Sequence, residues 1–328
     1  MIGRGRRVFR YVPLDELHGA SHVVVDGAPR PGTACTLSHW PGTPTPRSLW
    51  ADTSAEIVLQ ARRHPRALPA GVDLATVDHF DADGAIALAL LVDEGLAEGH
   101  AGALAAAATA GDFDVVADRD AALVAFAVAA LGEDRSLAEA ASAVLETLPE
   151  LVADPERFED LWGPEAEAFD ASKDLLRSGA VTIEEHPAVD LAVVRVDEAA
   201  SALARAGWAG AVVHPATIHS ATSCLRVATL WGSRYELYYR YESWVRLMSR
   251  RPRPRVDLTS LADRLGNLEA DGGAWAFDGA GAITPALRRA DGEPSGLGPR
   301  VFVEEIVDAL SRLDAGAPAW DPYAGVAR

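Results

Sequence analysis

A short polar cluster stands between two apolar runs in residues 72–90, where His79, Asp81 and Asp83 follow VDLATV and precede GAIALAL. Alternate side chains of an extended segment project to the same side, so this imidazole and these two carboxylates can converge on one point. Carboxylates buried without a partner are costly, and a divalent cation is the partner that mixed nitrogen and oxygen donors suit best. Mn²⁺ is the expected ion, with Mg²⁺ or Zn²⁺ as alternatives. The competing interpretation is an aspartate that caps a helix among solvated neighbours.

Gly84 follows the cluster directly and permits a tight turn into the apolar helix that the sequence predicts next. The first turn of a helix offers backbone amides and the positive end of its dipole to an anion. A metal ion beside a helix N-terminus favours a phosphate group. We therefore expect the partner of this site to be a small anionic ligand that contains phosphate.

Further donors could complete the ligand set, which we expect to be Asp26, His39, His79, Asp81, Asp83 and Asp112. Asp26 ends the apolar run HVVV, His39 lies in LSHWPG, and Asp112 lies in AGDF. The carboxyl ends of neighbouring parallel strands meet on one edge of a sheet, which would bring Asp26 and His39 close to Asp83. The set would suffice for one ion, or for two that clamp a phosphoryl group and activate a water. The alternatives are packing roles for Asp26 and His39 and a helix cap at Asp112.

A second polar group lies in the C-terminal half, in the segment HPATIHSATS (214–223). His214, His219 and Ser220 could bind the substrate there. They could equally be polar side chains whose hydrogen bonds are satisfied within a loop.

Arginines provide the other candidate contacts to an anion. Arg240, in the strand-like segment YELYYRYESWV, could hold a phosphate through two hydrogen bonds or pair with Glu236 or Glu242 on its own face. The run RLMSRRPRPR (246–255) is the one basic patch of the chain. It could meet a polyphosphate, or its prolines could mark a solvated loop.

The elements that must position these groups follow from the apolar patterns. The segments 22–27 and 72–80 are predicted strands because of their β-branched apolar runs. The stretch 28–46 between them, rich in Pro, Gly and Thr, predicts an irregular loop. Residues 54–64 form a predicted helix with Ser54 as a plausible N-cap, and the chain from Gly84 to Arg177 is mainly helical by its spacing.

Beyond residue 180 the segments become rich in strand-forming residues, with a hairpin turn expected at 232–233. We therefore expect an α/β fold with an N-terminal extension (1–20). A parallel-sheet domain with a helical insertion (21–180) and a smaller mixed α/β domain (181–328) would follow. The site would lie in the cleft between these two domains.

Composition narrows the function classes. The net charge of −18 argues against non-specific nucleic-acid binding as the main role. The two cysteines, far apart in sequence, indicate neither a disulfide framework nor a zinc cage. No run approaches the roughly 18 apolar residues of a spanning helix, so we expect a cytoplasmic protein without a membrane partner. Nothing in the sequence predicts the oligomeric state.

HFDADGAIALALL (79–91) resembles the first motif of the DHH-type phosphoesterase superfamily, and AGDF with Asp112 resembles its second. The resemblance implies a DHH-phosphoesterase-like fold in which His79, Asp81, Asp83 and Asp112 are the catalytic residues and hold a Mn²⁺ pair. It also implies a substrate-binding C-terminal domain, with RYELYYRYESW as its arginine-bearing strand. The DHH triplet itself is missing. The chain is also similar to an uncharacterised bacterial family of unknown function that shares SHWPG, HFDxDG, AGDF and RYExW.

Two functions follow from these observations. The first is a metal-dependent phosphoesterase-like hydrolase acting on a small phosphorylated or nucleotide-type substrate. The second is a catalytically inactive DHH-like module that binds a ligand or a partner, which the missing triplet favours.

Overall fold

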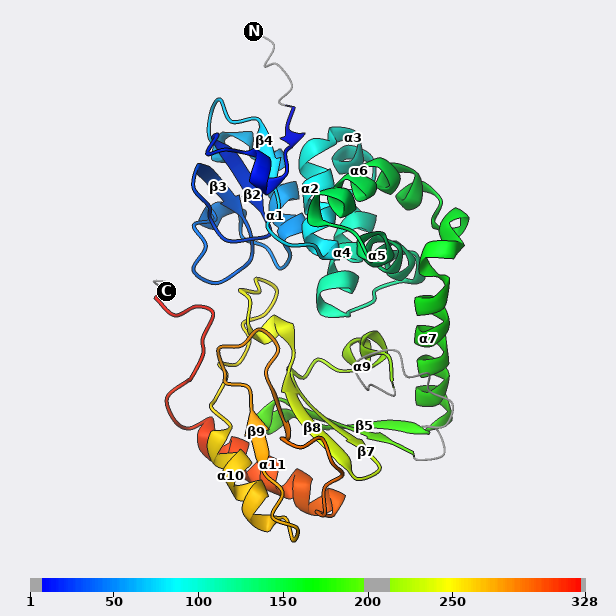
Figure 1. Ribbon diagram of the computed structural model, residues 1–328, viewed down its shortest axis with the longest axis vertical. Helices are drawn as coiled ribbons and strands as arrows, with labels where there is room; N and C mark the ends of the chain where they lie inside the picture. The colour runs from blue at the N-terminus through cyan, green and yellow to red at the C-terminus, as the bar shows by residue number, and fades with distance from the viewer. Residues whose placement is uncertain (1–7, 198–212, 326–328) are drawn as a thin grey trace. The chain divides into compact units, whose positions relative to one another are not determined.

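The computed structural model describes residues 8–197 and 213–325, which form two compact units. Unit 1 comprises residues Met1–Ala166 and Arg246–Arg250, and unit 2 comprises Glu167–Val245 and Arg251–Arg328. The predicted α/β class is confirmed, with one parallel and one mixed sheet (Figure 1).

The sheet of unit 1 has four strands in the order β1-β4-β2-β3, and every neighbouring pair is parallel. Its strands are β1 (Arg10–Tyr11), β2 (His22–Val25), β3 (Thr33–Leu37) and β4 (Leu74–Thr76). The order places β2 between β3 and β4. The carboxyl ends of these three strands therefore lie next to one another.

Strand β3 corrects the sequence analysis, which predicted an irregular loop over residues 28–46. Val23, Val24 and Val25 of β2 pair with Cys35, Thr36 and Leu37 of β3. Gly32 makes the turn before β3 with a φ of 91°, and a Cβ there would lie 2.7 Å from two backbone carbonyl oxygens. The Pro and Gly residues thus mark the ends of a short strand instead of excluding one.

The helices of unit 1 gather on one side of the sheet (Figure 1). They are α1 (Ser54–Arg63), α2 (Ala82–Val92), α3 (Glu94–Gly99), α4 (Ala101–Phe113), α5 (Arg119–Gly132) and α6 (Leu137–Ala153). Helix α2 is buried from Ala82 to Leu91 and packs against α1, α4 and α6. Apart from Asp83, its side chains are apolar all round, as expected of a helix that is covered on all sides.

Helix α7 (Glu159–Ser178) crosses the boundary between the units, and the sheet of unit 2 follows it. The strand order is β5-β6-β7-β8-β10-β9, and β6 and β7 alone among these pairs are parallel. The strands are β5 (Val181–His186), β6 (Leu191–Val196), β7 (Arg226–Trp231), β8 (Arg234–Tyr239), β9 (Trp275–Phe277) and β10 (Ala286–Arg289).

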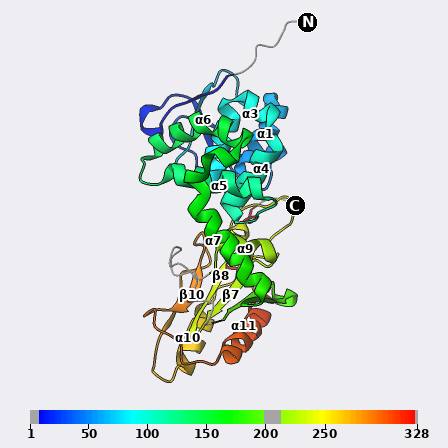
Figure 2. The same cartoon turned by 90° about the vertical axis from the view of Figure 1, so that its right-hand side faces the viewer.

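Two small groups of helices cover this sheet. Helices α10 (Thr259–Leu268) and α11 (Pro299–Leu313) pack on β6–β8 in one apolar cluster (Figure 2). The short helix α9 (Pro215–Ala221) joins a second cluster with α7, β5, β6 and β7. No helix among the described residues is long and apolar enough to cross a membrane.

Helix α4 approaches the start of α2 at Gly111. A Cβ at this position would lie 2.3 Å from the Cβ of Ala82, a separation that real Cβ atoms do not reach. The glycine of the AGDF motif therefore lets the last turn of α4 sit against the first turn of α2.

We expect Gly111→Ala to lower the free energy of unfolding by about 1–3 kcal/mol, because the added methyl group overpacks the α2–α4 contact. Urea unfolding measures this change. Gly102→Ala in the same helix is the matched control, since no atom lies within 4 Å of its Cβ position. The control should be neutral or stabilising by up to about 1 kcal/mol. Equal stability of the two variants would contradict the close packing.

Candidate metal centre

The candidate ligands gather where β2, β3 and β4 end. Asp26 follows β2, His39 follows β3, and the segment from His79 to Asp83 follows β4. Asp112 joins them from the last turn of α4. Parallel strands that end together make this edge the usual place for a ligand in α/β folds.

Asp83 ties the starts of two helices together. Its Oδ2 accepts a hydrogen bond from the Ser54 backbone amide at 2.6 Å, and its Oδ1 accepts one from Ala55 at 2.8 Å. These amides belong to the first turn of α1, which favours a negative charge. Thr53, and not Ser54 as the sequence suggested, caps α1 through a capping box with Glu56.

Because Thr53 is the N-cap of α1, the Ser54 hydroxyl can bind Asp26, the residue at the centre of the site. This hydroxyl donates to Asp26 Oδ1 at 2.6 Å, and Asp26 is 1% exposed. The backbone of Asp26 has a φ of 45°, the left-handed region that a non-glycine residue rarely occupies. Among the described residues, Asp26 Oδ2 has no hydrogen-bond partner. A buried carboxylate oxygen that accepts no hydrogen bond is typical of functional sites.

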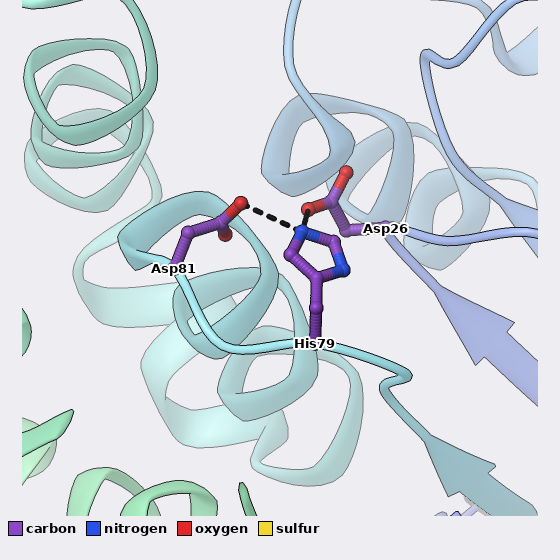
Figure 3. Close-up of side chains that lie close together, drawn as sticks. All are labelled: Asp26, His79 and Asp81. Atoms are coloured by element: carbon purple, nitrogen blue, oxygen red, sulfur yellow. Dashed lines mark hydrogen bonds and ion pairs between the residues drawn. The ribbon is translucent and has the colours of Figure 1, made fainter. Parts of the chain in front are cut away.

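His79 lies between carboxylates (Figure 3). Its Nε2 is 2.8 Å from Asp81 Oδ2 and 3.4 Å from Asp26 Oδ2. Its Nδ1 is 3.0 Å from Asp78 Oδ1. Burial opposes the charged ring, but the hydrogen bonds to Asp78 and Asp81 outweigh it and raise the pKa of His79 to about 11. Arg30 in turn holds Asp78 Oδ2 at 3.0 Å. Without a metal ion, His79 is thus a cation that partly neutralises the site.

His39 has the opposite electrostatic state. Its Nδ1 is 2.7 Å from the Asp52 carbonyl oxygen, which can only accept, so Nδ1 carries the proton. Burial lowers the pKa of His39 and keeps the ring neutral. Its Nε2 lone pair then faces Asp26 Oδ1 at 3.6 Å and Asp112 Oδ2 at 3.7 Å. A lone pair held toward two carboxylate oxygens is repulsive unless a proton or a cation lies between them.

The other carboxyl groups of the site are buried close together, which disfavours their ionisation. Burial, together with Asp81, raises the pKa of Asp26 to about 8, and burial with the charge of Asp26 raises that of Asp83 to about 7. No arginine pairs with Asp26, Asp81 or Asp83 within the part of the chain that the structure describes. The negative charge is therefore balanced by protons, by His79 or by a bound cation.

Two groups of donors share Asp26. One is Asp26, His79 and Asp81, and the other is Asp26, His39 and Asp83. In each group the ligand atoms lie within 4.8 Å of one another. The side chains of His79 and Asp81 are 34% and 32% exposed, so the first group opens to solvent, whereas the second is buried.

All six expected metal ligands therefore lie in unit 1, and the structure brings them together without residues of unit 2. The four expected substrate contacts lie in unit 2. His214 accepts the Ala216 amide through Nδ1, and His219 Nε2 lies 3.1 Å from the Tyr238 hydroxyl. Ser220 is exposed on α9.

Arg240 pairs with Glu242, which is one of the alternatives that the sequence left open. Its side chain is 1% exposed and pairs with Glu242 through Nε and one terminal nitrogen. The other terminal nitrogen donates to the carbonyl oxygens of His219 and Thr222. All three guanidinium nitrogens are therefore bound within the protein, which makes Arg240 a structural tie.

The sequence analysis missed the residues that orient the ligands. Asp78 and Asp52 hold the Nδ1 atoms of His79 and His39, and Ser54 holds Asp26. Asp78 directly precedes His79 and could have been suspected, because metal-binding histidines usually donate their second N–H to an oxygen. Nothing in the sequence pattern indicates that the Asp52 carbonyl meets His39.

Most of the chain matches a known protein family. A model of a family of unknown function, DUF6687, matches residues 7–317. No curated protein and no solved structure matches the chain. Because the match spans nearly the whole sequence, the chain belongs to the DUF6687 family.

Proposed function

We propose that unit 1 binds divalent metal ions through Asp26 and its neighbours, and that the protein is a metal-dependent phosphoesterase-like hydrolase. The observation that carries the proposal is the orientation of His39. The Asp52 carbonyl fixes its tautomer, so a neutral Nε2 faces Asp26 and Asp112. A cation between these atoms would convert the contact into coordination, and it would bind Asp26 Oδ2, which has an ion pair with His79 at 3.4 Å but no hydrogen bond.

The donor set supports the choice of ion. Two imidazoles with four carboxylates suit Mn²⁺, and Mg²⁺ or Zn²⁺ are the alternatives. Because Asp26 belongs to both donor groups, it would bridge the ions if two were bound. The resemblance of residues 79–91 to the first DHH motif agrees with such a pair.

The protein supplies the rest of a phosphate site. Helix α2 begins beside the cluster, and Asp81 caps it by accepting the Gly84 amide at 2.7 Å. The positive end of its dipole favours an anion at the exposed side of the site, where His79 and Asp81 reach solvent. A bound divalent ion would activate a water and stabilise negative charge on a phosphoryl oxygen. The substrate class that fits is a small phosphorylated or nucleotide-type compound.

A second candidate function is a metal-binding module without hydrolytic activity. The observation that favours it is Arg240, which is bound to Glu242 and to carbonyl oxygens instead of facing a ligand. The absence of a DHH triplet points the same way. Both functions require the metal centre, and hydrolysis of a generic phosphodiester separates them.

Asp26→Asn should abolish Mn²⁺ binding, with a loss of affinity greater than the roughly 10- to 100-fold typical of outer-shell changes. Isothermal titration calorimetry measures the affinity, and hydrolysis of bis-p-nitrophenyl phosphate with Mn²⁺ measures the activity. Asp134→Asn is the matched control, because Asp134 is also a left-handed aspartate of unit 1 but is exposed and outside the site. Equal Mn²⁺ binding by wild type and Asp26→Asn would refute the proposed centre.

The same substitution should stabilise the metal-free protein. The amide keeps an oxygen for Ser54 and removes a buried negative charge, whose pKa is raised to about 8. Each kcal/mol gained raises Tm by about 2–4 °C in a domain of the size of unit 1. Thermal unfolding in EDTA near pH 8 tests this expectation. A lower Tm would mean that Asp26 stabilises the fold.

Stability should also depend on pH in a defined direction. The folded-state pKa values of Asp26 and Asp83, about 8 and about 7, exceed the unfolded value of 3.8, so the folded state binds more protons. The contribution of these two protonated groups to the free energy of unfolding is complete below about pH 4, and it is lost as the pH rises through about 8. Mn²⁺ competes with these protons, so the Tm gain on adding Mn²⁺ should be larger near pH 8 than near pH 5.5. The Asp26→Asn variant should lose most of this pH dependence of the Tm gain. An equal Tm gain at both pH values in the wild type would contradict the prediction.

A further inference from the structure

A segment from the C-terminal half of the sequence packs beside the candidate ligand His39. Residues Arg246–Arg250 belong to unit 1, although the residues on both sides of them belong to unit 2. The sequence allowed two interpretations of this basic run, a contact for polyphosphate or a solvated loop. Arg246 fits neither, because it is 5% exposed.

Arg246 fixes the loop that carries His39. Its backbone amide donates to the His39 carbonyl oxygen at 3.3 Å. Its guanidinium donates to the Trp40 carbonyl at 2.6 Å and to the Thr43 hydroxyl at 2.9 Å, and it lies 4.3 Å from the centroid of the Trp50 ring. An arginine used in this way ties residues 39–50 to a segment about two hundred positions later in the chain.

Asp52 connects the same segment to the His39 side chain. Its Oδ1 accepts the backbone amides of Met248 and Ser249, and its own amide donates to Glu56. The backbone carbonyl of Asp52 is thereby held in the direction from which it accepts the His39 Nδ1 proton at 2.7 Å. We call this group of contacts, made by Asp52 with Met248 and Ser249, the Asp52 clasp.

We infer that the Asp52 clasp is a positioning device for the metal centre, which holds His39 in the tautomer and orientation that present Nε2 to the ion. This inference rests on the proposed metal function. Asp52 and Arg246 are thus positioning residues, and neither contacts an ion. The site then depends on residues near both 52 and 248, so its integrity requires a long-range contact within unit 1.

The clasp explains why Asp52 accepts two backbone amides that the capping of α1 does not require. Asp52 precedes the N-cap Thr53, and the start of α1 needs only the capping box of Thr53 and Glu56. The two additional amides on Asp52 come from outside the helix and add nothing to its capping. Their effect falls on the carbonyl that faces His39.

The test is Mn²⁺ titration of Asp52→Ala, compared with the wild type. Loss of an outer-shell support should weaken Mn²⁺ binding by about tenfold or more. Asp52→Asn keeps an acceptor for the two amides and should restore an affinity within about threefold of the wild type. Asp93→Ala is the control for lost stability, because Asp93 also accepts two backbone amides in unit 1, those of Gly95 and Leu96, and lies at the start of α3.

A second readout does not depend on metal. With ¹⁵N-labelled histidine and His39→Gln for assignment, the metal-free wild type should show His39 as a neutral ring protonated at Nδ1. Asp52→Ala should lose this single tautomer, and Asp93→Ala should keep it. If Asp52→Ala fails to fold, Arg246→Met takes its place as the test variant and should also lose the single tautomer of His39.

The outcomes separate the two proposals. Unchanged Mn²⁺ affinity and an unchanged His39 tautomer in Asp52→Ala would overturn the positioning role, and so would an equal loss of affinity in Asp93→Ala. A wild type that binds no Mn²⁺ would remove the proposed function, and the histidine spectrum would still decide whether the clasp fixes His39.

Discussion

Negative charge buried beside a fixed imidazole lone pair is the constraint on which unit 1 depends. Asp26 has a left-handed backbone conformation and lies between His39 and His79, and the Ser54 hydroxyl donates to one of its oxygens. A fold gains no stability from such an arrangement by itself, since desolvation of carboxylates is costly. The arrangement becomes favourable when a cation is present, and for this reason we propose that these groups hold a metal ion.

The surrounding elements all serve to bring these groups together. Three adjacent parallel strands end at the site, and Asp83 joins the first turns of α1 and α2. Gly111 removes the side chain that would keep Asp112 and its helix away from α2. The two histidines differ in their supports, since a carboxylate holds His79 and a carbonyl holds His39. His79 is consequently protonated in the metal-free site, whereas His39 is neutral.

The sequence could bring most of the candidate donors together because strand ends and alternation are local patterns. Asp26, His39 and Asp83 could be placed on one edge as soon as parallel pairing was assumed, whereas Asp112, at the end of α4, was suggested by its resemblance to the second DHH motif. Strand β3 was missed because its flanking Pro and Gly residues hid a five-residue strand that pairing with β2 defines. Arg240 and Arg246 could not be interpreted from the sequence, because their acceptors are backbone carbonyls that only the tertiary structure brings within reach. Hydrophobic patterns say nothing about such contacts.

The most direct measurement is anomalous X-ray diffraction from crystals of the full chain grown with Mn²⁺ near neutral pH. The account predicts an anomalous peak within coordination distance of Asp26 and His39, with Nε2 of His39 as a ligand, and it allows a second peak beside His79 and Asp81. A map with no peak at Asp26, while the His39 Nε2 lone pair still faces the carboxylates, would contradict the central claim.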